Sequence, residues 1–150
     1  MNILTRKTSK EGIELIKRFE SFSPRRYLCP GGYETIGFGH RLLVQENYID
    51  ITLTCAEELL FKDLVKFEHA VLKYINVDLL DNQFDALVSF TFNLGPAALQ
   101  RSTLRQKVNS EDFSEASLEF LRWIYVGSKR LNGLFKRRLA ESELFSRSSN

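Results

Sequence analysis

The stretch ELIKRFESFSPRRYLCPGGYETIGFGH, residues 14–40, changes character halfway along its length. Apolar residues recur at helical spacing from residue 13 to residue 19, which predicts a helix over about residues 10–22. Beyond it, the turn sequence Pro30-Gly31-Gly32 separates two short runs of strand-favouring residues. We therefore expect a β-hairpin over residues 25–40.

Two glycines, Gly37 and Gly39, lie in the second expected strand. Glycine inside a strand indicates that another part of the chain, or a ligand, approaches the backbone closely. A short third strand is expected near residues 49–53.

Two capping boxes are expected to start helices. Thr8 with Glu11 precedes the first helix, and Thr54 with Glu57 precedes a long helix that should reach about Tyr74. Each pair has the three-residue spacing at which the two side chains bond to each other's backbone N–H groups.

Beyond residue 80 the chain is expected to be helical to its end. Asp81 should cap a helix over residues 82–93, whose apolar residues lie nearly all round it and predict a buried central position. Gly95-Pro96 should end this helix. Shorter helices are expected at residues 96–100, 103–108, 112–125 and 131–145.

These elements predict a mainly α member of the α+β class, folded as a single domain over residues 1–150. A small N-terminal lobe with the hairpin takes about residues 10–55, and a connecting helix takes about 55–75. A helical C-terminal lobe takes about 76–146. A cleft between such lobes is the natural place for a ligand.

The composition is that of a folded globular protein, with 43% hydrophobic and 27% charged residues. The N-terminus is too polar before Lys10 for a signal peptide, so the protein is expected to stay where it is made, with Cys29 and Cys55 as free thiols. The cysteines and the two histidines match no zinc spacing, and neither a metal nor a cofactor is expected.

Positive charge gathers in the C-terminal third. A run without an acid holds Lys129, Arg130, Lys136, Arg137 and Arg138. It is either a solvated helix face or a patch for an anionic partner such as nucleic acid, lipid or a cell-wall polymer. Nucleic acid ranks last among these, since no binding motif accompanies the charge.

Glu20, Cys29 and Thr35 stand out by position, at the end of the expected helix, the end of the first strand and early in the second. Hydrolysis of a glycosidic bond needs an acid for the leaving oxygen and a group that positions water on the opposite face of the sugar. A helix C-terminus and burial both disfavour the carboxylate form, which suits Glu20 as the acid, and the Thr35 hydroxyl can orient water. The alternatives are a surface glutamate and a small buried cysteine.

These three residues match the spacing Glu, eight residues, Asp or Cys, five residues, Thr, and the segment over residues 14–40 resembles the start of the phage endolysin lysozymes. Residues 83–109 resemble that family's central helix and the segment after it, and residues 131–141 resemble the start of its C-terminal helix. The resemblance implies a muramidase that cleaves the β-1,4 bond between N-acetylmuramic acid and N-acetylglucosamine, with inversion. Glu20 would be the general acid and Thr35 would hold the attacking water.

Cys29 lies where many members of that family carry Asp. We expect its thiol to be mostly neutral, because its ordinary pKa is about 8.5 and a nearby Glu20 carboxylate would raise that pKa. The sulfur could still help to place water. The alternative function is a catalytically impaired peptidoglycan-binding module.

The resemblance also implies roles for other residues. It assigns substrate binding to Phe92, Asn93 and Thr103, against core packing and helix capping as the alternatives, and a structural ion pair to His40 with Asp63. Either Arg137 or Arg138 would pair with Glu20. The expected partner is bacterial peptidoglycan, reached by a monomer from the host cytoplasm without membrane insertion, once a separate holin-type protein has opened the membrane.

Overall fold

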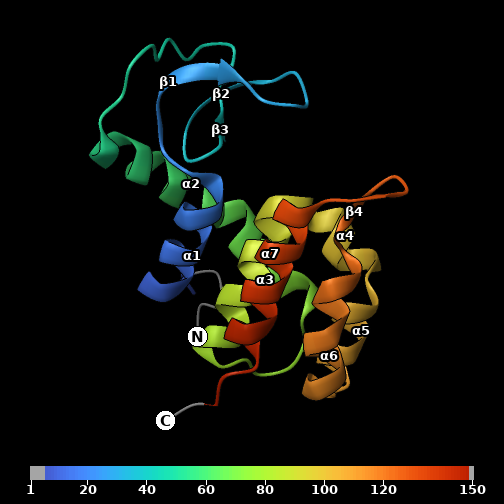
Figure 1. The fold of residues 1–150 in the computed structure, drawn as a ribbon. Helices are drawn as coiled ribbons and strands as arrows, with labels where there is room; N and C mark the ends of the chain where they lie inside the picture. Colours follow the sequence, from blue (N-terminus) through green and yellow to red (C-terminus); the bar gives the residue numbers. More distant parts are fainter. Residues whose placement is uncertain (1–5, 149–150) are drawn as a thin grey trace. The chain divides into compact units, whose positions relative to one another are not determined.

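A computed structural model describes residues 6–148 of the chain (Figure 1). Those residues form two compact units, which we call the hairpin unit (residues 16–65) and the helical unit (residues 6–15 with 66–148). The elements in chain order are α1 (Lys10–Glu20), β1 (Ser23–Leu28), β2 (Glu34–Gly37), β3 (His40–Arg41), α2 (Leu53–Tyr74), α3 (Asp81–Leu94), α4 (Pro96–Arg101), α5 (Thr103–Asn109), α6 (Phe113–Glu119), the 3-10 helix η2 (Phe120–Arg122), β4 (Tyr125–Val126), β5 (Lys129–Arg130) and α7 (Asn132–Phe145).

The predicted α+β class and the N-terminal hairpin are confirmed. Strands β1, β2 and β3 form an antiparallel sheet in that order. The third strand is β3 and not the segment near residues 49–53, where the expectation was wrong. That segment makes an isolated bridge between Asp50 and Arg25, and Ile51 N–H donates to the Pro24 carbonyl at 2.8 Å before α2 begins.

The first helix begins without the predicted Thr8 capping box. The Thr8 backbone N–H and its hydroxyl both donate to Glu68 at 2.7 Å, while the Ser9 carbonyl accepts the first helical bond from Ile13. Glu11 instead pairs with Arg147. The buried Glu68 carboxylate requires donors, and Thr8 supplies them in place of capping its own helix.

The second capping box is also displaced. The Thr52 hydroxyl caps α2 by accepting from the Cys55 N–H at 3.1 Å, so the observed cap lies two residues before the predicted cap at Thr54 and the helix begins at Leu53. Glu57 bonds to the Lys17 ammonium at 2.7 Å.

The helical unit is built on α3, whose residues 83–91 are all buried, as the all-round apolar pattern predicts. The expected stop is confirmed, since Gly95 follows the helix with φ at +96° and Pro96 opens α4. Asp81 is the first residue of the helix and not its cap, and it pairs with Arg6 at 3.2 Å.

The helix predicted over residues 112–125 is shorter in the structure. Helix α6 and the 3-10 turn end at Arg122, and the chain then forms a β-hairpin from β4 and β5. The expectation of helix to the end of the chain was wrong here because Gly127, with φ at +61°, makes a tight turn that helical periodicity does not reveal.

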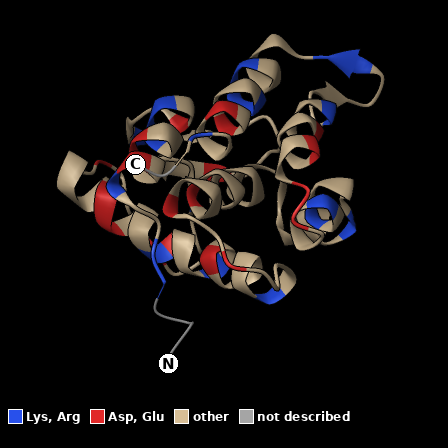
Figure 2. Cartoon of the chain, turned by 90° about the horizontal axis from the view of Figure 1, so that it is seen from below, with Lys and Arg blue, Asp and Glu red and all other residues tan. Residues whose placement is uncertain are grey.

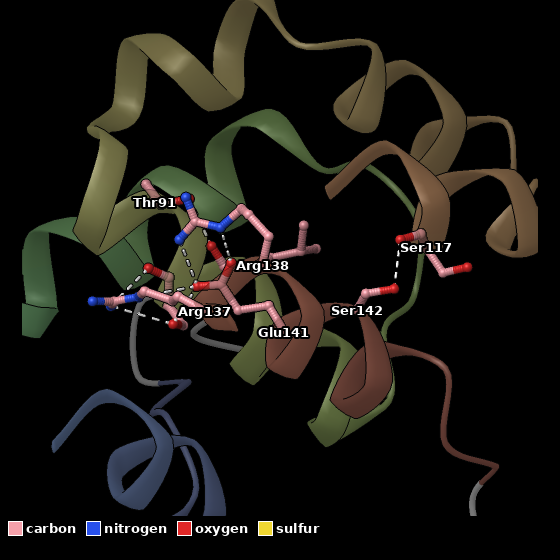
Figure 3. A network of polar contacts seen from close by, with 8 residues as sticks. Thr91, Ser117, Arg137, Arg138, Glu141 and Ser142 are labelled. Atoms are coloured by element: carbon pink, nitrogen blue, oxygen red, sulfur yellow. Dashed lines mark hydrogen bonds and ion pairs between the residues drawn. The ribbon is translucent and has the colours of Figure 1, made fainter. Parts of the chain in front are cut away.

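The structure also corrects the view of the basic run as one continuous solvated face. Arg137 and Arg138 are buried on α7, and Arg138 has no exposed surface. Glu141 accepts from Arg138 Nε at 2.6 Å, from Arg137 Nε at 3.3 Å and from the Ser89 hydroxyl at 2.5 Å (Figure 3). The Arg138 guanidinium also lies 5.3 Å above the Phe90 ring. Burial lowers the pKa of Arg138, and Glu141 opposes that effect.

No helix in the described part of the chain combines the length and the apolar character needed to span a membrane.

We predict that Glu141→Gln lowers the free energy of unfolding by about 3–5 kcal/mol, because it leaves two buried arginines without a counter-charge. Urea denaturation followed by circular dichroism measures the change. The control is Glu143→Gln on the exposed side of the same helix, which should cost under about 0.5 kcal/mol. Equal losses in the two variants would contradict the role given to Glu141.

Candidate active site

Glu20 is the last residue of α1 in the hairpin unit. Ser21 follows with φ at +61° and donates its N–H to the Lys17 carbonyl at 2.9 Å, which closes the helix and turns the chain toward β1. The Glu20 side chain is partly exposed. The helix end therefore presents a carboxylate beside the first strand.

The Glu20 carboxylate lies against Gly39, in the turn between β2 and β3. A Cβ atom at Gly39 would lie 2.8 Å from Glu20 Oε1, and the φ of Gly39 is +77°. At Gly37, the side chains of Ala56 and Ile51 lie 3.2 Å from the equivalent position. The close approaches expected at both glycines are confirmed, and side chains make them.

Cys29 and Thr35 flank the turn of the β1–β2 hairpin. Cys29 N–H donates to the Tyr33 carbonyl at 2.9 Å, which closes the turn. Thr35 is buried in β2 opposite Tyr27 of β1, and its hydroxyl donates to the same Tyr33 carbonyl at 3.0 Å. The Thr35 oxygen keeps lone pairs with which it can accept a hydrogen bond from water.

The pKa of Cys29 is lowered, which contradicts the expectation that Glu20 would raise it. The backbone N–H of Tyr33 has the largest effect, burial opposes it, and the Thr35 hydroxyl, the Gly31 N–H and the Arg41 charge lower it further. The Tyr33 and Gly31 N–H groups reach the sulfur because Cys29 begins the turn to which both residues belong. Sequence spacing does not reveal this, since backbone N–H groups carry no sequence signal.

Tyr27 is a neighbour that the sequence analysis did not single out. Burial raises its pKa most, and the charges of Glu20 and Cys29 raise it further. Both groups are thus close enough to Tyr27 to act on it electrostatically. With Thr35 across the ladder, four side chains gather on one part of the hairpin unit.

His40 is buried in β3 between two carboxylates. Its Nδ1 lies 2.8 Å from Asp63 Oδ2 on α2, and its Nε2 lies 2.9 Å from Glu46 Oε1. The hydrogen bond to Asp63 is the main cause that raises the His40 pKa to about 9, against the opposing effect of burial. Glu46 was missed from the sequence, and it also accepts from the Leu43 N–H at 2.7 Å.

The residues assigned to substrate binding belong to the helical unit. The Phe92 ring packs edge-on against Phe67, with centroids 5.2 Å apart. The Asn93 Oδ1 atom is buried and has no hydrogen-bond partner among residues 6–148. Ser102, and not Thr103, caps α5 by accepting from the Arg105 N–H, so the exposed Thr103 is not the cap of its helix.

Comparison with known proteins identifies the family. The phage lysozyme family model matches residues 17–141. The chain belongs to the phage lysozyme family. The predicted resemblance is confirmed. The family also confirms the predicted enzyme class, which is a glycoside hydrolase of the lysozyme type. The chain is 43% identical to the endolysin of Bacillus phage B103 over 139 residues, which cover 91% of this chain and 53% of that protein. It therefore spans about half the length of that relative.

A second relative matches along nearly its whole length. The endolysin of Acyrthosiphon pisum secondary endosymbiont phage 1 is 40% identical over 141 residues, covering 91% of this chain and 96% of that one. Among solved structures, the muramidase domain of SpmX from Asticaccaulis excentricus has a TM-score of 0.87 at 34% identity, covering 95% of this chain and 99% of that one. The fold of this phage lysozyme family member is thus shared with solved relatives.

We predict that Gly39→Ala removes nearly all lysozyme activity, because the added methyl group would displace the Glu20 carboxylate. The control is Gly32→Ala, whose φ of +84° imposes a similar strain while no atom lies within 4 Å of the added carbon. Each change should cost about 1 kcal/mol of stability, measured by thermal unfolding. Activity that falls equally in both variants would show that backbone strain, and not the Glu20 contact, is responsible.

We predict that Asp63→Asn destabilises the fold by about 1–3 kcal/mol at pH 6 with little change in turnover, because it removes the charge that holds protonated His40. The raised pKa sets the sign, since this contribution is fully present below pH 6.5 and is lost as the pH rises through about 9. Urea denaturation at pH 6 and pH 10 should show a smaller loss at the higher pH.

The control for that measurement is Asp50→Asn, which breaks the exposed pair with Arg25 and should cost under about 1 kcal/mol at either pH. A loss in Asp63→Asn that is the same at both pH values would rule out a charged His40 as its cause.

Proposed function

We propose that the chain is an endolysin that hydrolyses the β-1,4 bonds between N-acetylmuramic acid and N-acetylglucosamine, with Glu20 as the general acid. The observation that carries the proposal is the Glu20 carboxylate at the end of α1, held against Gly39 and acting, like Cys29, on the charge state of Tyr27. Membership of the phage lysozyme family supports peptidoglycan as the substrate.

In this proposal Glu20 gives its proton to the glycosidic oxygen as the bond to the anomeric carbon breaks. A water molecule attacks that carbon from the opposite face, which inverts its configuration, and the proton it releases leaves to solvent or a nearby base. Thr35 positions the water by accepting one of its hydrogen bonds, and its single hydroxyl proton is shared between the Tyr33 carbonyl and the Cys29 sulfur.

In this proposal Cys29, when ionised, supplies negative charge near the sugar. Because its pKa is lowered by the Tyr33 N–H and the other donors of the turn, a larger fraction of thiolate is present near neutral pH than in an ordinary cysteine. An anion beside the developing positive charge on the sugar stabilises the transition state. The turn thus lets a thiol serve where many family members carry a carboxylate.

We extend the proposal to substrate binding by Phe92, Asn93 and Thr103. The buried Asn93 Oδ1 lacks a donor among the described residues, and the N–H of an N-acetyl group would satisfy it. The exposed Thr103 hydroxyl is not used to cap its helix, which leaves it for a sugar. His40 with Asp63 is given a structural role.

The same proposal places the protein in host-cell lysis. Relatives named endolysins support this role. The enzyme would act as a monomer and would reach peptidoglycan from the host cytoplasm after a holin-type protein has opened the membrane.

We predict that Glu20→Gln lowers turnover by about 100- to 10,000-fold with the fold preserved, because shape is kept while the proton donor is lost. Cys29→Ser should lower turnover, and Cys29→Asp should retain it, because only the second change keeps a negative charge. The measurements are turbidity loss of permeabilised Gram-negative cells and release of reducing ends from purified sacculi.

Near-normal activity in Glu20→Gln would remove Glu20 from the mechanism. A folded parent chain that binds sacculi without releasing reducing ends would instead be a peptidoglycan-binding module.

A further inference from the structure

Three cations near the C-terminal hairpin have no acidic partner within the described part of the chain. Between Glu119 and Glu141 the chain has six Lys or Arg residues and no Asp or Glu. Glu119 pairs with Arg122 at 2.9 Å, and Glu141 forms ion pairs with the two buried arginines of α7. Among residues 6–148, no carboxylate lies within ion-pair distance of the remaining cations, which are Lys129, Arg130 and Lys136.

The hairpin of β4 and β5 displays two of these charges, Lys129 and Arg130, on a short ribbon. Tyr125 lies opposite Arg130, and Val126 lies opposite Lys129, so each face of the ribbon carries one cation and one apolar side chain. Tyr125 is 55% exposed and Val126 is 62% exposed. Figure 2 draws the Lys–Arg strand as a blue arrow with no acidic residue beside it on the hairpin.

The hairpin is fixed to the start of α7. The Arg130 guanidinium lies 4.6 Å above the Phe135 ring, and the next residue is the exposed Lys136. The third cation therefore follows directly on the residue that Arg130 contacts, and the surface formed by residues 125–130 with Lys136 is what we call the basic hairpin.

We propose that the basic hairpin binds the carboxylates of the peptide stems that branch from peptidoglycan strands. The inference rests on the proposed function, which makes peptidoglycan the substrate. Peptide stems carry free carboxylates, and exposed Lys and Arg side chains without internal partners are complementary to them. Tyr125 and Val126 supply apolar contacts for the small side chains of the stem.

A lipid surface fits the basic hairpin less well. Stable adsorption to a membrane needs a broad apolar face in addition to cations, and the ribbon offers only two apolar side chains on opposite faces. Carboxylates on a flexible peptide can reach both faces of a narrow ribbon, whereas a flat bilayer contacts one.

The test compares Lys129→Gln/Lys136→Gln with a control that removes the same charge elsewhere in the helical unit, Lys66→Gln/Lys73→Gln. All four lysines are exposed, and neither pair includes a residue assigned to catalysis. Reducing-end release from purified sacculi gives KM and kcat, and co-sedimentation of the chain with sacculi gives the binding constant. Both are repeated on sacculi whose carboxylates have been amidated with carbodiimide and ethanolamine.

We expect the basic-hairpin variant to raise KM and to weaken co-sedimentation by about 3- to 10-fold on untreated sacculi, with kcat unchanged. The control should match the parent. Amidation should weaken parent binding to the level of the variant, and raised salt should narrow the difference.

Equal binding by the variant and the control on untreated sacculi would overturn the inference, as would a difference that persists after amidation. Binding of the parent to phosphatidylglycerol vesicles that only the basic-hairpin variant loses, with sacculus binding unchanged, would assign the surface to lipid instead. A parent that releases no reducing ends refutes the proposed function alone, because co-sedimentation still measures stem binding.

Discussion

The Glu141 carboxylate is fully buried and accepts hydrogen bonds from two buried arginines of its own helix and from Ser89 on α3. A buried charge without a partner is costly, so this one group holds α3 and α7 in a single arrangement. The same constraint acts at the start of the chain, where Asp85 and Glu68 take their donors from Ser9 and Thr8. The core of the helical unit therefore has a polar framework as well as an apolar one.

The hairpin unit meets a related constraint with a buried histidine and two carboxylates. His40 is the only buried residue of this unit, among those described, that can carry a positive charge. It joins β3 to α2 through Asp63 and to the following turn through Glu46. The β2–β3 turn that His40 anchors also contains Gly39, whose missing side chain makes room for Glu20. The position of the proposed acid thus depends on the turn that the contacts of His40 hold in place.

Patterns that are local in the sequence predicted much of this structure. The N-terminal hairpin, the buried helix α3 and its stop at Gly95-Pro96 follow from periodicity and turn residues. Signals that compete with distant partners failed, as at Thr8, whose hydroxyl bonds to Glu68 sixty residues away. The burial of Arg138 was hidden for a different reason, since a cation three residues before an acid also suits a solvated helix face. Of the candidate site, position in the sequence singled out Glu20, Cys29 and Thr35, but not Tyr27 or the backbone donors near Cys29.

Those donors bear on the exchange of Asp for Cys. A partly exposed carboxylate is ionised at neutral pH, so it needs no hydrogen bonds from the surrounding backbone to carry its charge. A thiol must be made acidic, and at Cys29 the turn does this with the N–H of Tyr33, aided by the Thr35 hydroxyl and the Gly31 N–H. Because Thr35 is also the proposed water ligand, the same hydroxyl affects both the acidity of the sulfur and the proposed position of the nucleophile. Cysteine in this place is therefore coupled to the geometry of the turn in a way that aspartate is not.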